Sequence, residues 1–324
     1  MSLAAVRSVV RMTMADGQRP EWETVPADVR GYVEERVKAR VVGARTGGGG
    51  YTSGLACRLE LDDGGWVFVK GVAAGHVLEG MYRGEVRLTS ALPAGAPVPR
   101  LLWSCLPEDG PGWVLLCLED LPGGHPDLSG SGEAAELVAT LGKLAAAVTP
   151  CPLPEAPQVA ELMGPSLACW RKLAADVPAD LDPVMLRNLD KLMGLERVWE
   201  QYAHGTTLLH TDVRADNVMR RESGEMVIID WDFPRQGAAW IEAVFLAPRL
   251  VMEGHEPGAA RGLVAPLLED AKEEAVVSLA VALAGHWEYC GRQRPMPGVP
   301  GLRALQKATA GAAWAWVTEL VRLG

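Results

Sequence analysis

The sequence predicts an α+β protein of two lobes, in which an antiparallel sheet comes first and helices follow. Two observations support this prediction. Up to about residue 118, short apolar segments with strand-like alternation are separated by turns rich in Gly, Asp and Pro. Beyond the turn at 121–124, apolar residues recur mostly at helical spacing. Strands followed by helices are typical of the α+β class. We therefore expect an N-lobe at 1–118, a hinge at 119–124 and a C-lobe at 125–324.

The N-lobe is expected to form one sheet with an inserted helix. Alternation in Leu55–Leu61, the turn signal in Asp62–Gly65 and the apolar segment Trp66–Val69 predict a β-hairpin that ends at Lys70. The expected elements are, in order, a helix at 26–38, strands at 40–46, 55–61 and 66–69, a helix at 75–92, and strands at 101–106 and 113–118.

The C-lobe is expected to be mostly helical, with a short strand and a hairpin in its middle. Pro266 should break or kink one long helical segment, because proline lacks the amide hydrogen of the helical ladder. The expected elements are helices at 133–148, 160–175 and 183–202, a strand at 207–209, a hairpin whose second strand is 226–229, and helices at 240–252, 260–286 and 302–323.

The composition narrows the classes of function. The chain has 48% apolar and 22% charged residues, as an ordinary globular protein does. Its net charge of −10 comes without a basic stripe, which argues against a nucleic-acid partner. Six cysteines without a C-x-x-C pair predict buried free thiols.

The sequence gives no indication of a membrane partner. Met1–Met14 has arginines within its apolar residues, so we expect a loose tail and no signal peptide. The segment Ala275–Trp287 is too short to span a bilayer and is expected to be a buried helix. The expected location is the cytoplasm.

The segment Leu208–Val218 has the strongest chemical signature. It contains His210, Asp212 and Asn217 in the pattern H-x-D-x-x-x-x-N, and thirteen residues later an apolar strand ends at Asp230. Phosphoryl transfer needs an oriented nucleophile, bound metal ions and a neutralised triphosphate. Asp212 could face the attacking hydroxyl, and oxygen ligands from Asn217 and Asp230 suit Mg²⁺. Singly, an Asp or Asn in a loop is more often a turn or helix cap. Together with the flanking apolar strands, they favour a kinase.

Independent support comes from the N-lobe. The strand Trp66–Val69 leads into Lys70, as does the kinase strand that ends in the phosphate-pairing lysine. Glu85, fifteen residues further on, lies in the predicted helix and is the favoured partner of Lys70. Glu79 competes for this role because it lies in the same helix. Considered singly, each of these three side chains could equally be a solvated residue on the surface of its strand or helix.

With Lys70, Asp212, Asn217 and Asp230, the chain resembles the aminoglycoside phosphotransferase and choline kinase family, which are protein-kinase-like small-molecule kinases. The resemblance extends from about Val41 to the C-terminal helices and implies the bilobal protein-kinase-like fold. It implies ATP or GTP as phosphoryl donor and Mg²⁺ as cofactor. Asp212 would be the catalytic base, and Asn217 and Asp230 the metal ligands.

The resemblance assigns further residues more loosely. Arg214 matches a cation that faces the transferred phosphate, and Lys70 with Glu85 would bind the α- and β-phosphates. The segment 49–54 resembles the looser glycine loops of small-molecule kinases, in which backbone amides cradle phosphate oxygens. The phosphate-binding candidates there are Gly50, Thr52 and Ser53. Backbone groups from Glu119 to Leu121 lie where the family's hinge would bind the purine.

Several neighbouring residues receive weaker assignments. His210 is expected to be a buried ring that supports the loop, and Asp216 to be solvated. Asp232 could assist the metal site or cap the next turn. Four tryptophans of the C-terminal helices are expected in the core, with an aromatic pocket as the alternative: Trp240, Trp287, Trp314 and Trp316. Seven carboxylates there are expected to be solvated, with binding of substrate ammonium groups left open: Glu242, Glu253, Glu269, Asp270, Glu273, Glu274 and Glu288.

The resulting expectation is an O-phosphotransferase that acts on a hydroxyl of an antibiotic, aminoglycoside-like or other, or of a related metabolite. Antibiotic resistance would be the accompanying role. The first alternative is a protein-directed or regulatory kinase, which the short segment after Asp232 disfavours. The second is a non-catalytic nucleotide-binding scaffold, which the presence of all four motif residues disfavours. The identity of the acceptor, the choice between ATP and GTP, and the oligomeric state stay open.

Overall fold

A five-stranded antiparallel sheet forms the N-terminal part of the protein. The computed structural model describes residues 19–47, 53–231, 234–295 and 301–323. The strands follow the order β1-β2-β3-β5-β4 across the sheet. Their bounds are β1 Val41–Thr46, β2 Leu55–Leu61, β3 Trp66–Ala73, β4 Leu101–Cys105 and β5 Trp113–Glu119. All five strands were predicted, but β3 does not end at Lys70. It continues to Ala73 because residues 67–73 pair along their whole length with β5.

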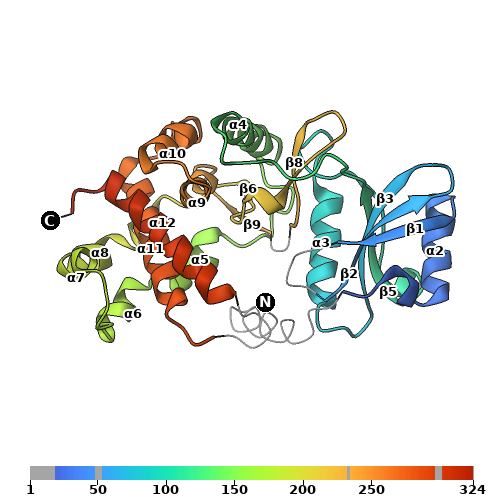
Figure 1. Ribbon diagram of the computed structural model, residues 1–324, viewed down its shortest axis with the longest axis horizontal. Helices are drawn as coiled ribbons and strands as arrows, with labels where there is room; N and C mark the ends of the chain where they lie inside the picture. Colours follow the sequence, from blue (N-terminus) through green and yellow to red (C-terminus); the bar gives the residue numbers. More distant parts are fainter. Residues whose placement is uncertain (1–18, 48–52, 232–233, 296–300, 324) are drawn as a thin grey trace.

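Alternation along the central strands gives the sheet two apolar faces, each covered by a helix. The helix α2 (Ala27–Val37) packs Val29 and Val33 on the face that carries Leu115 and Cys117. The helix α3 (Glu79–Ala91) packs on the opposite face, which carries Leu116. Figure 1 shows α3 on the side of the sheet that faces the helical region, and α2 on the far side. Residues on the inner side of α3 can therefore reach a site between the two regions.

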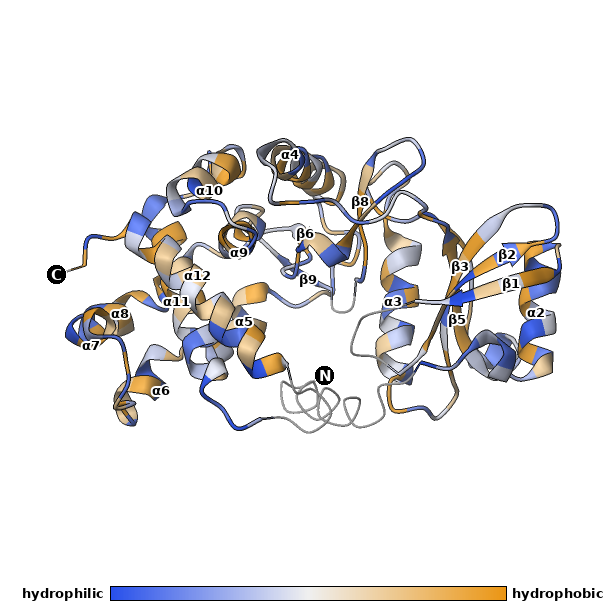
Figure 2. Ribbon diagram, in the orientation of Figure 1, coloured by the Kyte–Doolittle hydropathy of each residue, from blue (hydrophilic) through white to orange (hydrophobic). Residues whose placement is uncertain are grey.

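The rest of the described chain is mostly helical. Its longer helices are α4 Ser131–Ala147, α9 Ile241–Met252, α11 Glu273–Gly291 and α12 Leu302–Leu320. Its shorter helices are α5 Val159–Leu167, α6 Trp170–Ala175, α7 Pro183–Arg187, α8 Leu189–Leu195 and α10 Pro257–Val264. Figure 2 shows apolar colouring on the strands β3 and β5 and on the helix α9, among other elements, and most residues of β5 and α9 are buried. The predicted α+β fold is confirmed.

Two long helices predicted from periodicity are interrupted. The segment 160–175 forms α5 and α6 instead of one helix, and α6 begins where the Trp170 amide donates to the buried carboxylate of Glu196 at 2.7 Å. The segment 183–202 forms α7, α8 and a 3₁₀ turn at Val198–Gln201. There the Trp199 amide donates to Ser278 Oγ of α11 at 2.7 Å. In both cases a distant side chain satisfies a backbone amide that a continuous helix would have used.

Two short ribbons lie between the sheet and the helices. β6 (Thr207–Leu209) pairs with β9 (Arg235–Gly237), and β7 (Val218–Arg220) pairs with β8 (Met226–Ile228). β9 was not predicted. The two predicted motif segments lie side by side, because the Ile229 amide after β8 donates to the Asn217 carbonyl oxygen at 2.9 Å.

The cysteine and membrane predictions can also be compared with the structure. All six cysteines are free, and all but the half-buried Cys290 are buried, as predicted. In the described part of the chain, no helix is both long and apolar enough to cross a membrane.

Candidate active site

Two adjoining cavities lie on either side of the segment that follows β8. The first, the sheet-side cavity, has a volume of about 410 Å³ and is lined by residues of β1, β3, α3 and the segment after β5, with Lys70 among them. The second, the helix-side cavity, has a volume of about 450 Å³ and is lined by α5, α9, α11 and the loop after β6, with Asp212 among them. Asp230 and Trp231 line both cavities, so the cavities meet at these residues.

A lysine and two carboxylates form an ion-pair network in the sheet-side cavity. Lys70 Nζ of β3 lies 2.7 Å from Glu85 Oε1 of α3 and 3.2 Å from Asp230 Oδ1. Burial raises the pKa of Glu85, and the Lys70 charge offsets part of that rise. The Lys70 charge also lowers the pKa of Asp230 below its usual value, although burial of this carboxylate opposes the shift. Glu79, the competing partner, instead forms an ion pair with Arg83 at 2.8 Å.

The loop after β6 carries the histidine and aspartate of the motif. The His210 ring is buried, and its Nε2 lies 2.9 Å from the Ile229 carbonyl oxygen, as expected for a ring that supports the loop. Thr211 and Asp230 adopt left-handed backbone conformations, with φ of 61° and 66°. Such angles are uncommon outside glycine, and they recur at functional sites where the surrounding structure enforces them.

A buried glutamate of α9 enforces the conformation of this loop. The Glu242 carboxylate accepts hydrogen bonds from the backbone amides of His210 and Thr211, the latter at 2.8 Å. Only 7% of Glu242 is exposed, so the expectation that this carboxylate is solvated was wrong, and Glu242 lines neither cavity. The sequence indicates this burial, because Glu242 is the single acidic residue within the apolar segment 240–248.

Asp212 lies at the mouth of the helix-side cavity, with its side chain 52% exposed. Arg214 Nε lies 3.4 Å from Asp212 Oδ2 and 3.2 Å from Asp216 Oδ1. Asn217 is buried and donates from Nδ2 to the Asp212 carbonyl oxygen at 2.8 Å. The structure therefore places Asp212 in the wall of the helix-side cavity, while Arg214 and Asn217, which contact it, line the sheet-side cavity.

The residues at this junction are suited to Mg²⁺ bound together with a triphosphate. Because Asn217 donates from its amide nitrogen to the loop, its amide oxygen is the atom left to serve as a ligand. Asp230 adds a carboxylate that is 43% exposed. Among the described residues, no cluster of three or more His, Cys, Asp or Glu side chains could hold a metal alone. An amide and one carboxylate with phosphate oxygens form a typical magnesium environment.

The glycine loop is described only at its end. Gly50 and Thr52, two of its predicted phosphate ligands, lie outside the described residues, as does Asp232. Ser53 is half-buried and is not among the residues that line either cavity. The next residue, Gly54, packs against the Tyr82 hydroxyl group of α3, where a Cβ atom would collide with that hydroxyl.

The hinge residues line the sheet-side cavity. Both Glu119 and Leu121 do so, as the prediction of a purine site requires. The Glu119 carboxylate accepts from Arg221 Nη2 at 2.8 Å and from the Arg100 amide at 2.9 Å. Burial alone would raise the pKa of Glu119, but these two partners lower it below its usual value. The Glu119 side chain is thus used within the protein, and its backbone amide donates to the Arg100 carbonyl oxygen at 2.9 Å.

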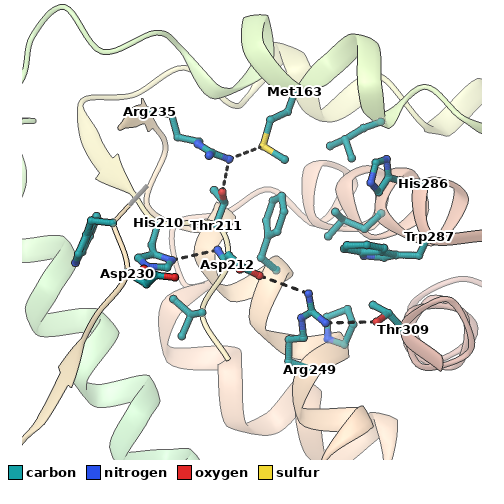
Figure 3. Close-up of a pocket in the computed structure, with 16 residues that line it drawn as sticks. Met163, His210, Thr211, Asp212, Asp230, Arg235, Arg249, His286, Trp287 and Thr309 are labelled. Atoms are coloured by element: carbon teal, nitrogen blue, oxygen red, sulfur yellow. Dashed lines mark hydrogen bonds and ion pairs between the residues drawn. The ribbon is translucent and has the colours of Figure 1, made fainter. Parts of the chain in front are cut away.

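The helix-side cavity contains residues that the sequence did not identify. Figure 3 shows Arg235 and Arg249 on opposite sides of Asp212, with Trp287 and His286 on the wall formed by α11. Of the four tryptophans considered, Trp287 lines this cavity, whereas Trp240 and Trp316 are buried, as expected for the core. A carboxylate beside a cavity lined by cations, with a second cavity adjoining, is an arrangement compatible with phosphoryl transfer.

The comparisons with known proteins agree with this class. The model of the phosphotransferase enzyme family matches residues 53–276, and the chain belongs to this family. A search of curated proteins found no match.

Solved structures of small-molecule kinases share the fold. An aminoglycoside phosphotransferase from Alicyclobacillus acidocaldarius has a TM-score of 0.58 at 15% identity, over 86% of this chain and 91% of that one. A spectinomycin phosphotransferase solved with ADP and spectinomycin has a TM-score of 0.59 at 12% identity, over 90% of this chain and 98% of that one. A putative fructosamine-3-kinase from Thermobifida fusca has a TM-score of 0.54 at 18% identity, over 90% of this chain and 98% of that one.

Proposed function

We propose that the protein is a small-molecule kinase of the cytoplasm, which transfers the γ-phosphoryl group of ATP or GTP to a hydroxyl group. The proposed acceptor is an antibiotic or a related metabolite, and antibiotic resistance is the proposed role. The observation that carries the proposal is the position of Asp212 in the wall of one cavity, in contact with Arg214 and Asn217, which line a second, triphosphate-sized cavity. β9 begins at Arg235, five positions after Asp230, which leaves no room for a long activation segment. This favours a small molecule over a protein substrate.

Each residue has a role that follows from its position. Lys70, held by Glu85, neutralises the α- and β-phosphates, and the hinge at 119–124 between N-lobe and C-lobe contacts the base through its backbone. Asp212 accepts the proton of the acceptor hydroxyl as this oxygen attacks the γ-phosphorus. Arg214 faces the transferred group and stabilises its developing charge. Mg²⁺, held by Asn217 and Asp230, would neutralise the triphosphate when bound.

Replacement of Asp212 tests the proposal. We expect Asp212→Asn to lower turnover by about two to four orders of magnitude, as for the loss of a general base. Its affinity for nucleotide should stay within a few-fold of wild type, because the sheet-side cavity is unchanged. Asp230→Ala should instead abolish metal-dependent nucleotide binding. The assay incubates enzyme, Mg²⁺, ATP or GTP and a panel of hydroxylated antibiotics, and mass spectrometry detects products heavier by one phosphoryl group. Full turnover by Asp212→Asn would refute the assignment.

A further inference from the structure

The charge of the helix-side cavity differs from that of a site for polycations. Among its described lining residues, the carboxylates are Asp212 and Asp230 alone, and Asp230 already forms an ion pair with Lys70. Two guanidinium groups, those of Arg235 and Arg249, line the same cavity. No surplus of negative charge is therefore left among these residues to bind ammonium groups of a substrate.

Arg249 lies on α9 directly beside the proposed base. Its Nη2 atom is 3.5 Å from Asp212 Oδ1, and Nη1 donates to Thr309 Oγ1 of α12 at 3.3 Å. Its Cζ atom lies 5.4 Å from the centre of the Trp287 ring. The Arg249 side chain is only 16% exposed, so water screens its charge incompletely. A guanidinium stays charged in proteins, and its charge opposes the attraction that the Asp212 carboxylate would exert on an ammonium group of an acceptor.

Arg235 adds a second cation on the other side of Asp212 (Figure 3). Its Nη1 atom donates to Thr211 Oγ1 at 2.5 Å and contacts Met163 Sδ at 3.3 Å. These two contacts hold the guanidinium at the cavity wall. Asp212 therefore lies between two positive charges of the cavity wall.

The remaining wall is largely apolar. Rings come from Trp231, Phe245 and Trp287, and aliphatic surface from Leu167 and Leu283. Flat apolar walls of this kind bind ring systems through buried area and stacking. The wall therefore favours an acceptor with an apolar ring-bearing body.

We infer that the acceptor is an apolar, ring-bearing alcohol without ammonium groups on the part that enters the cavity, and that Arg249 selects against cations. This inference rests on the proposed function, because it treats the helix-side cavity as the acceptor site. It narrows the acceptor from antibiotics in general to uncharged or acidic hydroxylated compounds, and it excludes polyamine sugars.

Three matched alcohols test the inference: 4-methylbenzyl alcohol, 4-(hydroxymethyl)benzoate and 4-(aminomethyl)benzyl alcohol. They are neutral, anionic and cationic, and they share one ring and one hydroxymethyl group. Binding to the wild-type protein is followed by quenching of tryptophan fluorescence, because Trp231 and Trp287 line the cavity. We expect the neutral probe to bind at least about tenfold more tightly than the cation, because the ammonium group and the Arg249 guanidinium carry like charges, and two like charges a few ångströms apart in a half-buried site repel each other by more than the ~1.4 kcal/mol that tenfold requires. The anion should also bind more tightly than the cation.

Variants and salt separate the effect of Arg249 from other causes. Arg249→Gln should reduce the difference between the neutral and cationic probes to less than about threefold, whereas Arg249→Lys should keep it. Arg261→Gln is the matched control, because Arg261 lies on α10, is 47% exposed and lines neither cavity. Far-UV circular dichroism checks folding. In the wild-type protein, which needs no substitution, added salt should weaken the discrimination.

The outcomes distinguish the two proposals. A cationic probe that binds wild type as tightly as the neutral one overturns the inference, as does failure of the neutral probe to bind up to its solubility limit. Discrimination that survives in Arg249→Gln overturns the role of Arg249. Binding of ATP with Mg²⁺ and slow ADP formation are measured in parallel without any probe. Their absence would refute the proposed function, whereas their presence without charge discrimination would refute only the inference.

Discussion

The buried Glu242 offers the sharpest test of how the catalytic loop is held. Its carboxylate accepts the backbone amides of His210 and Thr211, the two residues directly before Asp212. In Glu242→Gln, one oxygen remains as an acceptor, but the new amide nitrogen would face a backbone donor. The loop should then relax from its left-handed conformation at Thr211, whose φ is 61°. Asp212 would move with it.

The size of the effect follows from these contacts. A hydrogen bond to a charged group contributes about 1.5–3 kcal/mol, and a buried donor left without a partner costs a further ~1–3 kcal/mol. Relaxation of one strained residue returns about 1–3 kcal/mol. We therefore expect the free energy of unfolding to fall by about 2 kcal/mol. A displacement of Asp212 by about 1 Å would lower kcat by roughly a hundredfold. The KM for ATP should change little, because Glu242 does not line the sheet-side cavity.

Urea unfolding and steady-state kinetics measure these quantities separately. kcat is expressed per folded molecule, so that loss of folded protein is not counted as loss of catalysis. Glu273→Gln is the matched control, since Glu273 begins α11 and its side chain is 83% exposed. An unchanged kcat per folded molecule in Glu242→Gln would refute the positioning role, even if stability fell. A kcat loss equal to a KM rise would point to a general distortion instead.

Two further predictions concern the glycine loop and the thiols. Gly54→Ala should raise the KM for ATP roughly tenfold, because the new Cβ atom collides with the Tyr82 hydroxyl and shifts the end of the loop. Gly31→Ala is the control, since no atom lies within 4 Å of its new Cβ atom, and equal KM values in both variants would contradict this reasoning. Burial raises the pKa of Cys117 to about 12, so this thiol should stay protonated and unlabelled by iodoacetamide as the pH rises from 7 to about 9. The half-buried Cys290 should be labelled first, and mass spectrometry that found Cys117 labelled before Cys290 in the folded protein would contradict the buried core.

Features that depend on neighbours along the chain could be predicted from the sequence. The hairpin that carries Lys70 followed from alternation and a turn signal, and its register pairs Lys70 with Ala56 of β2. The spacing of the loop motif indicated that Asp212 and Asn217 share one short loop. The Asn217 amide does donate to the Asp212 carbonyl oxygen. Local periodicity and local spacing are sufficient for features of this kind.

Features that depend on contacts between distant segments could not be predicted. Apolar periodicity continues from α5 into α6, so the sequence favoured one helix. The break reflects the tertiary bond from the Trp170 amide to Glu196, which is 26 positions away. The position of Arg249 could not be predicted either, because its neighbours along the chain are mostly apolar. Its position beside Asp212 depends on how α9 packs against the loop, 37 positions earlier in the chain. A charged residue inside an apolar helix indicates burial, but it does not identify the partner that makes burial tolerable.

The unpredicted strand β9 shows why acceptor binding and catalysis should be coupled in this protein. β9 pairs with β6 in a register that sets Arg235 opposite Leu209, the residue before His210. This register brings the Arg235 guanidinium to Thr211 Oγ1. The pairing of β6 with β9 therefore stabilises the loop that carries Asp212 and also places one cation in the wall of the helix-side cavity. Glu242 holds the same loop through its backbone. Because the Thr211 conformation depends on both contacts, a substrate group that draws Arg235 away from Thr211 would also disturb Asp212. The charge of the acceptor therefore bears on the geometry of the base as well as on binding.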